Sequence, residues 1–183
     1  MKKKDYLSIT DLKKALRDLD EKELTALIVD TYKKSEDVKQ LLSITFDRDQ
    51  MVPRLFEKYK KQIKDEFFPA RGNPKLRLSY ARQAITDFKK MSEDEERTFE
   101  LMIVYVENGV EFTNAFGDID APFYSSMIAM YSKIIDKCLL YPEFYDKYKN
   151  RLKAIVDNTE GIGWGFQDSL EDLFDAVYED DEE

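Results

Sequence analysis

The 183-residue sequence contains no histidine and a single cysteine, Cys138. Without histidine, the chain cannot build a Ser-His-Asp or Cys-His catalytic centre, imidazole acid–base catalysis or a histidine-ligated zinc site. One cysteine also excludes an internal disulfide, and it excludes thiolate zinc sites and iron–sulfur clusters held by this chain alone. The question of catalysis stays open, but these absences favour a protein that is not an enzyme, and we expect no cofactor.

Turn-forming residues and long apolar runs are also scarce. Six glycines and five prolines favour long helices over many short strands. The longest apolar run, Leu101–Val106, is far shorter than the roughly 20 residues of a membrane span. The basic start MKKKDYLSIT is not followed by the apolar stretch of a secretory signal. Together with the lone cysteine, these features predict a cytoplasmic protein that contacts no membrane.

The spacing of apolar residues predicts an all-α fold of about eight helices in one compact domain, residues 1–178. Within it, residues 10–43 form a helical hairpin that we treat as a subdomain, and residues 179–183 form an acidic tail. Its helices would be capped by Thr10, Asp20 and Ser35. Longer helices are expected at about residues 52–67, 74–91, 95–108, 121–140, 143–156 and 166–178.

Two of these helix boundaries depend on specific capping patterns. Asn73-Pro74 resembles an N-cap followed by a proline at the first helical position, which would begin a helix there. Ser92 and Glu95 have the spacing of a capping box. Asn108-Gly109 then predicts that the helix beginning at this box ends, and that an irregular connection follows.

Charge is distributed very unevenly along the chain. Residues 1–91 carry 22 basic and 15 acidic side chains, whereas residues 92–183 carry 7 basic and 23 acidic ones. The window 67–86 contains basic residues and no acid. If a helix begins at Asn73-Pro74, its free N–H groups and nearby side chains would form an anion site for a phosphate or carboxylate. The candidate residues are Arg71, Lys75, Ser79 and Arg82. The alternative is that these cations pair with the acidic second half of the chain.

Two further segments are candidates for chemistry, each with a simpler structural explanation. The carboxylates Glu111, Asp118 and Asp120 could ligate magnesium or calcium, but turns and caps need the same residue types. Three glycines in GIGWGFQD, residues 161–168, precede a helix but lack the Lys-Ser/Thr of a phosphate-binding loop. We therefore expect Trp164 and Phe166 to anchor the last helix to the core.

Several segments carry a family resemblance that covers nearly the whole chain. They are LKKALRDLDEKELTALIVDTYKKSEDVKQLL, FFPARGNPKLRLSYARQAITDFKK, YVENGVEFTNAFGDIDAPFYSSM and GIGWGFQDSLEDLFDAVY. Together they resemble a bacterial family of small all-helical proteins known only as a domain of unknown function. The resemblance implies an all-α bacterial intracellular protein, and it implies no activity or ligand.

These observations favour a non-enzymatic helical interaction module. Its partner would be another protein or a second copy of this chain, held by charge complementarity, and we expect no nucleic-acid partner. A second hypothesis is an enzyme or sensor of a phosphorylated small molecule, with Arg71, Lys75 and Arg82 holding the anion and Asp118 or Asp120 as metal ligand or base. A third is a protein whose acidic face mimics nucleic acid.

Overall fold

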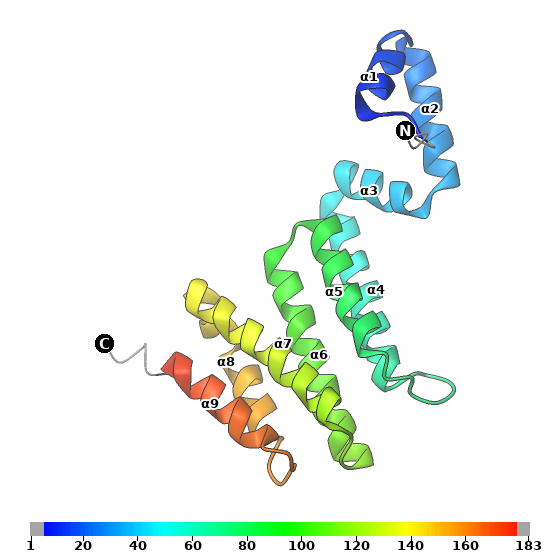
Figure 1. Cartoon of the computed structure of the whole chain (residues 1–183). Coiled ribbons are helices and arrows are strands. Elements are labelled where there is room, and N and C mark those ends of the chain that lie inside the picture. Colours follow the sequence, from blue (N-terminus) through cyan, green and yellow to red (C-terminus); the bar gives the residue numbers. More distant parts are fainter. Residues whose placement is uncertain (1–5, 179–183) are drawn as a thin grey trace, which may run out of the picture. The chain divides into compact units, whose positions relative to one another are not determined.

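The computed structural model describes residues 6–178 (Figure 1). Within this range the fold is all-α, as predicted, with nine helices rather than about eight and no strand. The expected acidic tail, residues 179–183, lies outside the described residues. The helices are α1 Ile9–Arg17, α2 Glu21–Lys34, α3 Glu36–Phe46, α4 Arg48–Phe67, α5 Leu78–Ser92, α6 Glu95–Phe116, α7 Ala121–Leu140, α8 Pro142–Asp157 and α9 Phe166–Tyr178.

The chain divides into two compact units, Met1–Met51 and Val52–Glu183, which we describe separately. We call them the N-terminal unit and the C-terminal unit. The division falls within α4, which begins at Arg48 rather than near residue 52 as expected. Pro53 therefore lies inside this helix and not in its first turn. At an interior position the proline removes one backbone hydrogen bond of the helix.

Side-chain caps define the three helices of the N-terminal unit. Ser8 caps α1 by accepting from the Asp11 N–H, so the expected cap at Thr10 is wrong by two residues. Asp20 caps α2 as predicted, and Glu23 completes a capping box with it. Ser35 caps α3, also as predicted.

These helices leave most of their apolar side chains exposed. Neither α1 nor α2 contains a buried residue, and Ile44 is the buried hydrophobic residue of α3. Ten large apolar side chains between residues 6 and 51 are exposed. A unit of this size normally needs additional burial or a partner to be stable.

The C-terminal unit is built around α6, which packs against α5, α7 and α8 (Figure 1). Its apolar run Leu101–Val106 is buried throughout. Neighbours on several sides explain why this helix is apolar nearly all round. The run is therefore part of a buried helix, in the segment predicted to be helical at about residues 95–108.

Gly109 lies inside α6, so the expected end of this helix at Asn108 is wrong. The Asn108 side chain donates to the Val104 carbonyl at 2.7 Å within the helix instead of forming a turn. A Cβ atom added at Gly109 would overlap the sulfur of Met127 on α7. The glycine is therefore explained by the close approach of α6 and α7 at this point.

We expect Gly109→Ala to lower the free energy of unfolding by about 1 kcal/mol, measured by urea denaturation. Overpacking a core costs about 1–3 kcal/mol, which outweighs the gain of up to about 1 kcal/mol in helix propensity. The control is the same substitution in a Met127→Ala background, where the overlap is removed and the penalty should disappear. A penalty of equal size in both backgrounds would contradict the packing explanation.

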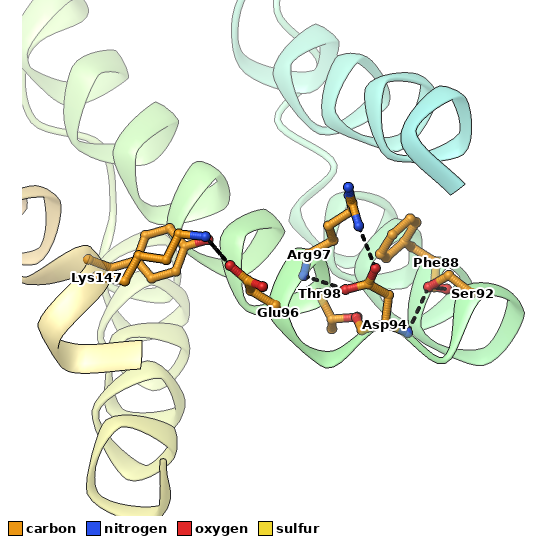
Figure 2. Close-up of polar contacts among 8 residues, drawn as sticks. Phe88, Ser92, Asp94, Glu96, Arg97, Thr98 and Lys147 are labelled. Carbon is orange, nitrogen blue, oxygen red and sulfur yellow. Dashed lines mark hydrogen bonds and ion pairs between the residues drawn. The ribbon is translucent and has the colours of Figure 1, made fainter. Parts of the chain in front are cut away.

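The junction between α5 and α6 differs from the predicted capping box of Ser92 and Glu95. Figure 2 shows that Asp94 caps α6, accepting from the Arg97 N–H at 2.8 Å. Ser92 is instead the last residue of α5, and its hydroxyl accepts from the Asp94 N–H at 3.2 Å. Between the two helices, Glu93 has a φ of 50°. This left-handed residue lets the chain leave one helix and enter the next within two residues.

Candidate anion-binding groove

Residues 68–77 form a loop, because α5 begins at Leu78 and not at the predicted position near Asn73-Pro74. Gly72 and Leu76 turn the chain with φ values of 80° and 49°. The Leu76 N–H donates to the Glu66 carbonyl at 3.0 Å. The predicted anion site at a helix N-terminus is therefore wrong, since Lys75 lies in this loop.

One buried carboxylate fixes the end of the loop. Glu66, near the end of α4, is 3% exposed. It accepts from the Arg77 backbone N–H at 3.1 Å, from Nε at 3.0 Å and from Nη2 at 2.6 Å. The Arg77 guanidinium lies over the Tyr80 ring at 4.6 Å. These bonds outweigh the opposing effect of burial and lower the pKa of Glu66. The sequence signal for this anchor was an acid directly before two phenylalanines. The charge distribution along the chain did not predict it.

The loop and the adjoining part of α4 enclose an open groove of about 670 Å³. Five basic and two acidic side chains line it, an excess of three positive charges in a chain with a net charge of −9. The acidic residues are Asp65 and Glu66. The basic residues are Lys58, Lys61, Arg71, Lys75 and Arg77.

The groove's cations differ in what they contact. Arg77 is held by Glu66, and Lys61 pairs with Asp65. Arg71 and Lys75 form no ion pair with any residue in the described range 6–178. The predicted alternative was that these cations pair with the acidic second half of the chain. Within that range, neither Arg71 nor Lys75 does so.

The carboxylates of α6 instead pair with other bases of the C-terminal unit. Lys89 and Lys137 each contact Glu95 at 2.7 Å. Arg151 donates to Glu107 through two nitrogens, at 2.8 and 2.7 Å, and to Glu100 at 3.2 Å. Lys147 pairs with Glu96, as Figure 2 shows.

The other two residues of the predicted anion site lie elsewhere. Arg82 donates from α5 to the Ser126 hydroxyl on α7, which also shares a hydrogen bond with Tyr105 at 2.8 Å. Neither Arg82 nor Ser79 lines the groove. The structure thus places Arg71 and Lys75 together in the groove, whereas Arg82 contacts Ser126 outside it.

The predicted metal ligands have separate structural roles. Asp118 accepts from the Tyr124 hydroxyl at 3.0 Å, and Asp120 caps α7 by accepting from the Phe123 N–H at 2.9 Å. Glu111 lines a different cavity of about 330 Å³, which Arg151 also lines. Among residues 6–178, no three acidic or cysteine side chains come together to hold a metal ion. The groove is lined by neither Asp118 nor Asp120, so the residues of the proposed enzyme site are not gathered there.

The two predicted anchors of the last helix have different environments. Phe166 is fully buried and packs on Tyr124, with ring centroids 5.0 Å apart. Trp164 is 64% exposed and has a φ of 64°. The expectation that Trp164 anchors the helix is therefore wrong, because the turn through Gly163 and Gly165 directs its ring to solvent.

Comparison with known proteins identifies the family and nothing more specific. The model of the Family of unknown function (DUF6155) matches residues 7–179, and the chain belongs to this family. The chain matches no curated protein and no solved structure. Every helix within the described residues is too short or too polar to cross a membrane.

Proposed function

We propose that this protein is a non-enzymatic helical interaction module, and that its N-terminal unit joins it to a second copy of the chain. The observation that carries the proposal is the exposure of apolar side chains on this unit. They are Tyr6, Leu7, Ile9, Leu12, Leu27, Ile28, Val29, Tyr32, Leu41 and Phe46.

Part of this surface forms an apolar groove of about 400 Å³ within the unit. Side chains of α2 line one side, and side chains from α3 and the start of α4 line the other. Asp47 is its one charged lining residue. Such a groove suits the apolar face of an amphipathic helix.

Area and charge both favour a second copy as the occupant. A large side chain has an area of roughly 150–200 Å², and the ten residues are between 40% and 87% exposed, so together they offer on the order of 1,000 Å². A standard interface buries about 800 Å² per partner. Residues 1–51 carry 11 basic and 11 acidic side chains. Contact through this neutral unit avoids the like-charge repulsion of residues 52–183, which carry the whole net charge of −9.

This apolar mode replaces the charge-driven association expected from the sequence. Four carboxylates of α6 are already paired within the chain, so they offer little to an external basic surface. Apolar contacts are not weakened by salt, whereas exposed charge pairs are. Salt dependence therefore separates the two modes of association.

The nucleic-acid mimic is less well supported. Its acidic surface would need continuous carboxylates on α8 and α9. Four basic residues are interspersed along α8, namely Lys147, Lys149, Arg151 and Lys153. A cytoplasmic location remains our proposal, supported by the single cysteine in the sequence.

We expect the purified chain to dimerise in sedimentation equilibrium, and Phe46→Lys to raise the dissociation constant at least about tenfold, equivalent to about 1.4 kcal/mol. Phe46 is 82% exposed and ends α3. A lysine there places a charge in the apolar contact while remaining compatible with a helix C-terminus. Raising the salt concentration to about 0.5 M should leave the dimer intact.

The matched control is Leu140→Lys, because Leu140 also ends a helix and is 68% exposed, but lies in the C-terminal unit. It should leave the dissociation constant unchanged. The proposal would be overturned if the chain were monomeric at every concentration. It would also be overturned if Phe46→Lys and Leu140→Lys raised the dissociation constant of the dimer equally. Dissociation by salt would support the charge-driven mode instead.

A further inference from the structure

We infer that the groove formed by α4 and residues 68–77 binds an oligophosphate, a ligand with two or more linked phosphate groups. This inference does not depend on the proposed self-association. The two involve different units of the chain and different chemistry.

The loop that forms one wall is held in place before any ligand binds. Glu66 accepts three hydrogen bonds from Arg77 through its carboxylate and one from Leu76 through its carbonyl. The left-handed conformation of Leu76, unfavourable for a side chain with a Cβ, persists because these bonds determine it. A wall fixed in this way reduces the conformational entropy lost on binding.

Cations extend from both walls of this groove. Lys58 and Lys61 come from α4, and Arg71 and Lys75 come from the loop. Arg71 and Lys75 have no ion-pair partner among residues 6–178, so their charges are available to a ligand. Lys75 also lies near enough to Glu66 for its charge to help lower the pKa of that carboxylate.

Phosphate matches this arrangement better than a single carboxylate does. A terminal phosphate group carries about −1.5 to −2 charges and offers three acceptor oxygens, and arginine binds such groups through two parallel hydrogen bonds. An excess of three positive charges exceeds the charge of one phosphate. The volume of about 670 Å³ lies within the usual range for small-molecule sites. Two or three linked phosphates satisfy both the charge and the space.

The lining residues support binding rather than chemistry. The two carboxylates of the groove, Asp65 and Glu66, are each engaged by a cation. Neither is positioned as a free general base. The site would therefore hold its ligand without transforming it.

The test is isothermal titration calorimetry of the full chain with inorganic triphosphate, at fixed ionic strength. We expect one saturable site per chain, and Arg71→Ala/Lys75→Ala should weaken it at least about tenfold. The matched control Lys133→Ala/Lys149→Ala removes two exposed lysines elsewhere and should leave the affinity within about twofold. Circular dichroism of each variant checks that the helices are retained.

Further ligands distinguish the source of the phosphates. Tighter binding of a nucleoside triphosphate than of inorganic triphosphate would assign the site to a nucleotide, and equal binding would assign it to the phosphate chain alone. No saturable binding of either ligand, or equal affinity in the groove variant and the wild type, would overturn the inference. Sulfate binding as tightly as triphosphate, or a short single-stranded oligonucleotide binding more tightly, would also overturn it.

Discussion

Phe166→Ala should destabilise this protein more than any other change considered, lowering the free energy of unfolding by about 3–5 kcal/mol. Phe166 is the first residue of α9 and is fully buried against Tyr124 of α7. Truncation leaves a cavity between α9 and α7, because the Phe166 ring packs on Tyr124. In thermal denaturation the melting temperature should fall by roughly 10 °C.

Trp164→Ala is the matched control, since it removes a larger aromatic ring two residues earlier. Its ring is exposed, so we expect a change within about 0.5 kcal/mol. If the two substitutions destabilised the protein equally, the assignment of the anchor to Phe166 alone would be wrong. The pair of substitutions therefore tests whether Phe166, and not Trp164, anchors α9 to the core.

Glu66→Gln should lower the free energy of unfolding by about 2 kcal/mol at pH 7, because it removes a charged acceptor of several hydrogen bonds at a buried position. It should also change how stability depends on pH. The bond to Arg77 lowers the pKa of Glu66 below its ordinary value of 4.5. A lowered folded-state pKa gives stability that is fully present above the unfolded pKa and is lost as pH falls through the folded pKa.

The difference between wild type and Glu66→Gln should therefore be largest at neutral pH and shrink as the pH falls below the ordinary carboxyl range, where Glu66 takes up its proton. Urea denaturation at several pH values measures it. Lys61→Ala, which breaks the exposed pair with Asp65, is the control and should cost little at any pH. A Glu66→Gln difference that stays constant with pH would show that the carboxylate is not the origin of the stabilisation.

The test of triphosphate binding and the test of Glu66 can be separated from each other. Arg71 and Lys75, which carry the oligophosphate inference, do not contact Glu66 through any ion pair of the described structure. Loss of triphosphate binding in Glu66→Gln alone would follow from displacement of the loop, residues 68–77. Loss of triphosphate binding in Arg71→Ala/Lys75→Ala, with an unchanged free energy of unfolding, would follow from the missing charges.

Local features of the sequence were enough to predict the helical class and several helix starts. Asp20 and Ser35 cap their helices as predicted, because a cap depends on hydrogen bonds within three residues. The helix predicted at about residues 95–108, which contains the apolar run Leu101–Val106, is present as the first part of α6. Such features need no knowledge of distant parts of the chain.

Two of the errors occur where a distant residue overrides the local pattern. Gly109 resembles a turn residue, yet it lies within α6, and Met127, 18 positions later, fills the space that a side chain at this position would take. Asn73-Pro74 resembles a helix start, yet Glu66 holds the following residues in a loop until Leu78. In both cases the competing contact lies outside the few residues that set a local preference.

The candidate site shows the same division between local and distant information. Charge counting alone located the basic window 67–86, since composition does not depend on the fold. Charge counting could not predict which of these cations face a common groove. Arg82 is turned toward Ser126 on α7, while Arg71 and Lys75 share a groove with lysines of α4. Folding brings these groups together or separates them, because side chains far apart in sequence become neighbours through helix packing.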